Sequence, residues 1–214
     1  MIQPLALKCK PAYTMNMLTL ILDTSTDYSL MALADGSELI AEYPLGVGRA
    51  SQTLLPQLQG FLKCHGYQLQ DLKAIAVGIG PGAFTGTRIA VTIAKALGFA
   101  LSIPLLPFCS LRAFKPLKPG PFNVLVDAKG SAVYALSGNH SNTTTYNTPE
   151  LLPLHALGSG PFLSPQAIDL QAKLNNSAQE WHSVQPSAKH LASQLQTLTP
   201  IPATSCEVLY LRTP

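Results

Sequence analysis

The sequence has little charge. Only 12% of its 214 residues are charged, whereas 47% are hydrophobic. This balance excludes intrinsic disorder, and so little charge predicts that some apolar surface meets a partner. The net charge of +3 comes from basic residues that are scattered singly. A dedicated nucleic-acid binder is not indicated, since such proteins cluster their Lys and Arg side chains.

Several catalytic and metal-binding motifs are absent. The four cysteines lie far apart and form no CxxC pair, which predicts reduced thiols in a cytoplasmic protein and neither a zinc site nor a disulfide framework. The histidines form no HxxxH or HExxH motif, so their spacing supplies no metallohydrolase site. No GxSxG motif provides the nucleophile of a serine hydrolase. We therefore expect neither a catalytic residue nor a bound metal in this chain.

Long apolar runs are also absent. The longest, such as Leu18 to Leu22 and Ile103 to Leu106, fall far short of the roughly 20 residues that span a membrane. Residues 1–16 lack the sustained apolar run and the cleavage site of a signal peptide. Two interpretations stay open: these residues are a flexible N-terminal extension, or Met17 is the true start.

The pattern that is present predicts an α/β protein in two lobes. Strands are expected over 17–22, 28–34, 38–43 and 73–79, with helices from 51 and from about 86 to 100, in the order β-β-β-α-β-α. The segment from Ile21 to Leu33 resembles that from Leu125 to Leu136. This similarity indicates a duplicated fold, unless two hairpins are alike by chance. We expect a first lobe over 17–111 and a reduced, proline-rich second lobe over 112–214, helical only at 166–174 and 187–198.

The glycine-rich turn GIGPGAFTGTR runs from Gly78 to Arg88, between a predicted strand and a predicted helix. Glycine allows close approach of a ligand, and a helix N-terminus offers free N–H groups and partial positive charge. Thr85 is expected to cap this helix and Arg88 to lie in its first turn. These features predict a phosphate or carboxylate site. The alternative is a tight turn that packs against neighbouring backbone.

A second candidate element is Asp23-Thr24-Ser25, where a strand-end carboxylate precedes two hydroxyls. In a phosphotransfer lobe such an Asp orients hydrated magnesium and the hydroxyls donate to phosphate. The alternative is an Asx turn that closes the hairpin. The candidate nucleotide-binding residues are Asp23, Thr24, Ser25, Gly80, Gly82, Thr85 and Asp127.

The helix after the turn has a stripe of small residues, Ala90, Ala94 and Gly98, beside an Ile/Leu stripe. Small residues let another helix pack closely, so the stripe faces either the core of this chain or a partner. If it faces a partner, a bulky residue at Gly98 blocks pairing without unfolding the chain.

Four segments together resemble the TsaB (YeaZ) family: LDTST from Leu22, SQTLLP from Ser51, GPGAFTGTRI from Gly80 and VLYLR from Val208. The resemblance is best over 17–111. It implies an actin-like (ASKHA) fold of two ribonuclease-H-like lobes, with a βββαβα first lobe. It also implies a non-catalytic scaffold role in making threonylcarbamoyladenosine on tRNA.

The resemblance further implies partners. The main one is a TsaD-type catalytic paralogue, bound as a heterodimer, and a TsaE-type ATPase joins the assembly. Both a homodimer and a monomer stay open for the chain when the paralogue is missing. No cofactor is expected in the chain itself, and any ATP and magnesium would act at the level of the complex. Contact with tRNA is expected through the complex, and no membrane is involved. Pairing is expected to use helices over 51–65 and 86–100. The implied interface residues are Leu54, Leu58, Phe84, Arg88, Ala90, Val91, Ala94 and Gly98.

Two other classes of function have less support from the residues. An independent ASKHA ATPase or phosphotransferase would use Asp23, Asp127 and the glycine turn. A peptidase has no support from the residues, because neither a nucleophile nor a metal set is present.

Overall fold

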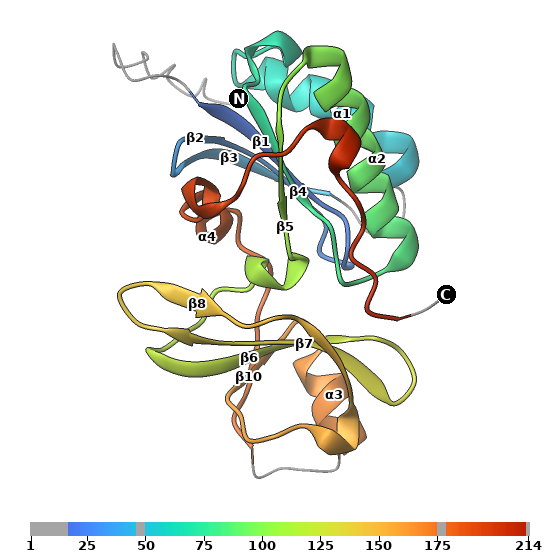
Figure 1. Cartoon of the computed structure of the whole chain (residues 1–214), viewed down its shortest axis with the longest axis vertical. Helices are drawn as coiled ribbons and strands as arrows, with labels where there is room; N and C mark the ends of the chain where they lie inside the picture. The colour runs from blue at the N-terminus through green and yellow to red at the C-terminus, as the bar shows by residue number, and fades with distance from the viewer. Residues whose placement is uncertain (1–16, 46–49, 175–178, 213–214) are drawn as a thin grey trace, which may run out of the picture.

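The computed structural model describes residues 17–45, 50–174 and 179–212, so the expected extension over 1–16 lies outside the described residues. The chain is α/β with two sheets, one in each of two lobes that Figure 1 shows stacked along the long axis of the molecule. This arrangement confirms the predicted fold class.

The sheet of the first lobe has the order β3-β2-β1-β4-β5. Its strands are β1 (Leu18–Asp23), β2 (Leu30–Asp35), β3 (Glu38–Pro44), β4 (Ala74–Gly78) and β5 (Leu105–Phe108). The first three form an antiparallel meander, and β4 and β5 run parallel to β1. Helices α1 (Ala50–Cys64) and α2 (Phe84–Leu101) cover one face, whereas α4 (Ala188–Ala192) lies on the other (Figure 1).

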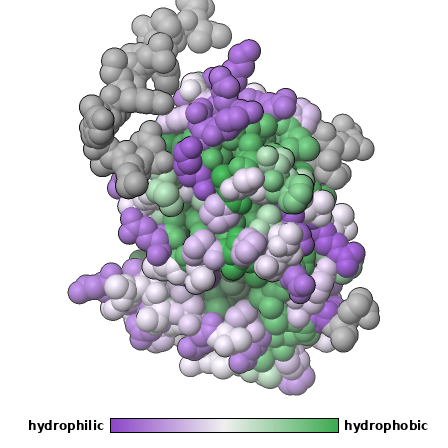
Figure 2. Space-filling view, turned by 45° about the horizontal axis from the view of Figure 1, so that its top comes forward, coloured by the Kyte–Doolittle hydropathy of each residue, from purple (hydrophilic) through white to green (hydrophobic). Residues whose placement is uncertain are grey.

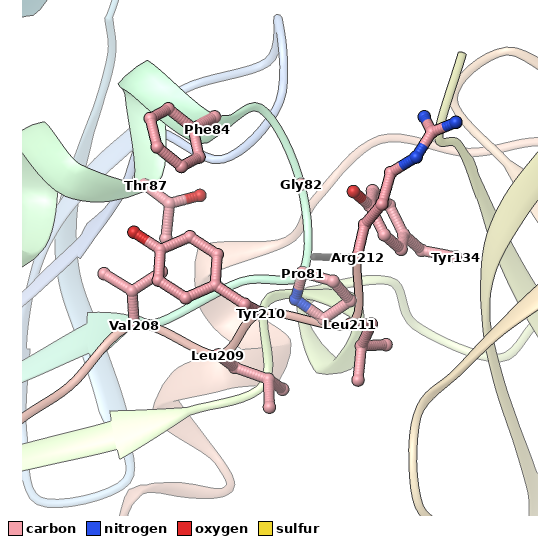
Figure 3. A pocket seen from close by; sticks show the side chains of 10 residues that line it. All are labelled: Pro81, Gly82, Phe84, Thr87, Tyr134, Val208, Leu209, Tyr210, Leu211 and Arg212. Carbon is pink, nitrogen blue, oxygen red and sulfur yellow. The ribbon is translucent and has the colours of Figure 1, made fainter. Parts of the chain in front are cut away.

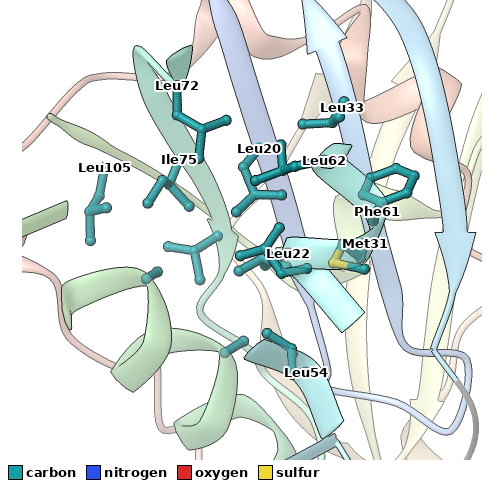
Figure 4. Packing of buried hydrophobic residues seen from close by; sticks show 14 of the residues in the cluster. Leu20, Leu22, Met31, Leu33, Leu54, Phe61, Leu62, Leu72, Ile75 and Leu105 are labelled. Carbon is teal, nitrogen blue, oxygen red and sulfur yellow. The ribbon is translucent and has the colours of Figure 1, made fainter. Parts of the chain in front are cut away.

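The core of the first lobe has a layer on each face of this sheet. Leu20 and Leu22 point into the layer beneath α1 and α2 (Figure 4), and Ile21 points into the layer beneath α4. All six residues of β1 are buried, because side chains alternate along a strand and both faces of the sheet are covered. The continuous apolar run that begins this lobe is therefore a central strand.

The sheet of the second lobe repeats the topology of the first, with the order β11-β10-β6-β7-β8. Its strands are β6 (Gly120–Asp127), β7 (Ala132–His140), β8 (Thr144–Tyr146), β10 (Phe162–Ser164) and β11 (Trp181–Ser183), and β9 (Glu150–Pro153) pairs with β7. Asp23 is the last residue of β1 and Asp127 the last residue of β6, and each of these strands is the first strand of a hairpin. The topology confirms the predicted duplication.

The second lobe also contains less α-helix than the first. Between β10 and β11 it has α3 (Ala167–Leu174), with 8 residues, where the first lobe has α2, with 18. After β11 the chain returns to the first lobe: α4 packs on its sheet, Ile201 pairs with Leu105, and Cys206 joins its core. The second lobe thus ends before α4, earlier than the expected 112–214, because the outer face of the first sheet needs this apolar cover.

By length and composition α2 meets the requirements of a membrane span, with 18 residues and a mean hydropathy of 1.2. From the sequence, every apolar stretch was expected to be too short to span a membrane. That expectation overlooked α2, because Arg88 and Lys95 interrupt its apolar residues. In the structure α2 lies along β4 as the cover of a sheet, and 28% of its residues are buried. Much of its apolar surface is therefore left outside the core.

A polar contact joins the lobes at α4. The Tyr146 hydroxyl of β8 lies 3.0 Å from His190 Nε2, and the Arg112 guanidinium stacks 4.8 Å from the Tyr146 ring centroid. Burial, together with the positive charges of Lys115, His140 and Arg112, lowers the pKa of His190 to about 4. His190 is therefore a neutral partner of Tyr146 near neutral pH.

This pKa predicts a loss of stability in acid. The unfolded chain takes up a proton at His190 near pH 6.5, whereas the folded chain does so only near pH 4. The free energy of unfolding should therefore fall as the pH is lowered from 6.5 to 4, by roughly 1–2 kcal/mol from this group. Urea unfolding of His190→Gln should show a smaller fall than the wild type, whereas His155→Gln, at an exposed histidine, should match the wild type. Equal pH dependence in all three proteins would contradict this account.

Candidate functional site

The glycine-rich turn packs directly on the backbone that follows β1. A Cβ atom added to Gly82 would clash with Ser25 O, and one added to Gly86 would clash with Thr24 O. The Ala83 amide donates to Ser25 O at 2.6 Å, and Thr24 Oγ1 donates to Gly86 O at 2.5 Å. The glycines thus allow close approach of this chain's own backbone, which is the tight-turn alternative.

The predicted helix cap is wrong. Helix α2 begins at Phe84, directly after Ala83, and Ala83 makes no side-chain cap hydrogen bond. Thr85 lies exposed within the first turn, and Arg88 lies one turn further along the helix. The amide of Gly80 is likewise occupied, because it donates to Ser110 Oγ at 3.0 Å.

The two strand-end carboxylates both close Asx turns. Asp23 Oδ1 accepts from the Ser25 amide and Asp127 Oδ1 from the Lys129 amide, each at 2.8 Å. Asp23 is buried, which raises the pKa of its carboxyl. Asp127 is partly desolvated, but the hydrogen bonds from Lys173 and Lys129 and their charges hold the pKa of its carboxyl below its usual range. Lys173 Nζ lies 2.8 Å from Asp127 Oδ2.

A cavity of about 150 Å³ lies beside the turn, between the lobes (Figure 3). Its lining residues are Pro81, Gly82, Phe84, Thr87, Tyr134, Val208, Leu209, Tyr210, Leu211 and Arg212. This volume is smaller than the roughly 300–1,000 Å³ of most sites for small molecules and cofactors. In the described part of the chain, no group of three or more His, Cys, Asp and Glu is arranged to hold a metal ion.

Six of the eight predicted interface residues belong to the core, which corrects their assignment to a partner surface. These residues are Leu54, Leu58, Ala90, Val91, Ala94 and Gly98. The small stripe of α2 faces inward because it lets the helix approach its neighbours: a Cβ at Gly98 would lie 2.9 Å from Leu105 Cδ2 and 3.1 Å from Ala203 Cβ. A bulky residue at Gly98 would therefore disturb the core, contrary to the expectation that it spares the fold.

Phe84 and Arg88, the other two, remain exposed on the opposite face of α2. There a shallow groove of about 380 Å³ is lined by Phe84, Thr85, Arg88, Ile89, Thr92 and Ile93; we name it the outer α2 groove. Figure 2 shows apolar surface reaching the exterior of the first lobe between polar patches. The half-exposed side chains of Ile89 and Ile93 thus contribute to the outer surface of α2, whereas the stripe of small residues does not.

At one end of this groove the side chain of Arg88 stacks on the ring of Phe84. The Arg88 guanidinium lies 3.7 Å from the Phe84 ring centroid, and Arg88 Nε donates to the Tyr210 hydroxyl at 2.6 Å. A cation over an aromatic face is favourable, so Arg88 is fixed in place. Tyr210 was not predicted as a site residue. The sequence signal for it was the resemblance of the VLYLR segment, from Val208, to the TsaB (YeaZ) family.

Parts of this chain resemble a known protein family and several known proteins. Residues 47–148 match the family described as TsaD, tRNA N6-adenosine threonylcarbamoyltransferase. The protein named tRNA threonylcarbamoyladenosine biosynthesis protein TsaB from Escherichia coli is 33% identical over 120 residues, 54% of this chain and 52% of that protein. Its namesake from Bacillus subtilis is 35% identical over 123 residues, 55% of this chain and 53% of that protein. The match to this chain thus spans about half the length of these curated relatives.

The solved structure of YeaZ from Pseudomonas aeruginosa superimposes with a TM-score of 0.77 and 23% identity, covering 91% of this chain and 99% of that one. Another structure from that organism, described as similar to peptidase YeaZ, gives the same TM-score at 24% identity. Fold and site together define a two-lobed actin-like α/β protein whose glycine turn is closed by its own backbone. The chain thus resembles proteins named TsaB over about half of its sequence, and it shares the fold of YeaZ.

Proposed function

We propose that this chain is a non-catalytic subunit in tRNA threonylcarbamoyladenosine synthesis, and that it binds a TsaD-type paralogue through the outer α2 groove. The observation that carries the proposal is the exposed apolar face of α2 beside a closed glycine turn. Curated relatives from Escherichia coli and Bacillus subtilis carry the name of this modification. The low charge of the chain also fits an apolar contact with another protein.

The kind of partner follows from the family match. The TsaD family matches residues 47–148, a stretch that includes both α1 and α2. A TsaD-type protein should therefore have a like pair of helices, and two like faces are able to pair about a pseudo-twofold axis. A stable contact of this kind buries about 800 Å² on each partner. The same face would serve a homodimer when the paralogue is missing.

A non-catalytic role is supported by how the candidate nucleotide-binding groups are used. Thr24 and Gly80 are hydrogen bonded within the chain, and Asp127 is paired with Lys173. ATP with magnesium would accordingly bind elsewhere in the assembly. A TsaE-type ATPase, contact with tRNA through the complex, and a cytoplasmic location complete the proposal.

Depletion of this chain in its own organism tests the proposed function. Nucleosides from total tRNA, separated by liquid chromatography and quantified by mass spectrometry, should show threonylcarbamoyladenosine falling at least about tenfold. Expression of the wild-type chain from a plasmid should restore it. An unchanged level of the modified nucleoside after full depletion would refute the proposal.

A further inference from the structure

The C-terminal segment from Val208 to Arg212 leaves the core of the first lobe and crosses to the second (Figures 1 and 3). Its main chain is fixed first on the glycine turn: the Leu209 amide donates to Ile79 O at 2.8 Å. Leu209 O packs over Gly80, where an added Cβ would lie 3.2 Å from that oxygen. The segment therefore starts from a defined position on the first lobe.

The next anchor is Tyr210. Its hydroxyl accepts from Arg88 Nε at 2.6 Å, and its ring centroid lies 5.6 Å from that of Phe84. Both partners belong to the first two turns of α2. Tyr210 thus binds the segment to the end of the helix that lines the outer α2 groove.

The last anchor lies on the second lobe. Arg212 Nη1 donates to Ala128 O at 3.0 Å, in the turn that joins β6 to β7. All five residues of the segment, together with Tyr134 of β7, line the interlobe cavity (Figure 3). The segment therefore occupies the space between the glycine turn and the second lobe.

The lobes are joined elsewhere by two crossings of the chain and, beside these crossings, by the contact of Tyr146 with His190 and Arg112. These crossings pair with each other, through a bridge between Phe114 and Pro186 and a 2.8 Å hydrogen bond from the Ser187 amide to Ala113 O. Figure 1 shows the C-terminal segment to the right of these crossings. Paired crossings alone resemble a hinge, about which two lobes are able to rotate. A third connection away from the hinge restrains that rotation.

We propose that residues 208–212 form a strap that couples the two lobes, so that they keep one orientation and unfold as one unit. The strap is independent of any ligand or partner. Its effect on pairing rests on the proposed function: because Phe84 and Arg88 contact Tyr210, the strap would also fix the edge of the outer α2 groove.

Two built-in probes follow the lobes separately. Trp181, the single tryptophan, lies in β11 of the second lobe, whereas the two long helices α1 and α2 lie in the first. In urea, Trp181 fluorescence and helical circular dichroism of the isolated wild-type chain should give coincident transitions. In Arg212→Ala, and in a chain truncated before Val208, the fluorescence midpoint should fall below the dichroism midpoint, by about 0.5 M or more.

A matched control removes a polar contact within one lobe. Lys118→Ala breaks the 2.8 Å ion pair with Glu180 in the second lobe, and its two transitions should still coincide. Coincident transitions in Arg212→Ala and in the truncated chain would overturn the proposal, as would separate transitions in the wild type. If the truncated chain fails to fold, Arg212→Ala decides alone, because it leaves the anchors at Leu209 and Tyr210 intact.

Discussion

Replacing Thr92 with arginine is expected to weaken binding to the TsaD-type partner by at least about 100-fold, with no change in the unfolding temperature. Thr92 is exposed and lines the outer α2 groove, so a larger residue there has room in the isolated chain. In the complex the guanidinium would be buried without a partner, which costs several kcal/mol. Isothermal titration calorimetry with the TsaD-type protein of the same organism measures the effect.

Thr148→Arg is the matched control for this variant. It places the same side chain at an exposed position of the second lobe, just before β9. We expect it to bind with the affinity of the wild type. Wild-type affinity in Thr92→Arg, or an equal loss in both variants, would show that the partner does not use the outer α2 groove.

Gly86→Ala is expected to lower the free energy of unfolding by about 3 kcal/mol, or to prevent folding. A Cβ at Gly86 would clash with Thr24 O, a backbone atom, so neither side can yield without moving the turn or the end of β1. The hydrogen bond from Thr24 Oγ1 to Gly86 O would be disturbed as well. Chemical denaturation followed by circular dichroism measures the loss.

Gly60→Ala is the corresponding control within a helix. Gly60 is exposed in α1, and a Cβ built there has nothing within 4 Å. Because alanine restricts the unfolded chain more than glycine does, this variant should be more stable than the wild type by roughly 0.5–1 kcal/mol. A Gly86→Ala variant as stable as Gly60→Ala would mean that the turn does not pack on Thr24 as described.

Much of the first lobe could be predicted from the sequence. Its central strands are largely apolar runs, and the helices show a clear period, so the order β-β-β-α-β-α follows from local pattern alone. The four-residue strand β5 was not among the predicted strands. The inward face of α2 could not be predicted in this way. Both of its stripes are apolar, and the choice between them depends on Leu105 and Ala203, whose approach admits only small residues.

The second lobe and the C-terminal return were harder to predict. Strands β8, β10 and β11 have three residues each, too few to show an alternating pattern. The contact between Arg88 and Tyr210 joins residues 122 positions apart, which no local signal shows. The positions of Asp23 and Asp127 at strand ends were predicted, but their Asx turns depend on backbone geometry that the residue types leave open.

We propose above all that this chain serves the tRNA modification through the outer α2 groove. The most direct test of this claim is rescue of the depleted strain by variant chains, with threonylcarbamoyladenosine measured in total tRNA. Thr92→Arg, accumulated to the wild-type level, should fail to restore the modification, whereas Thr148→Arg should restore it fully. Full restoration by Thr92→Arg would contradict the claim.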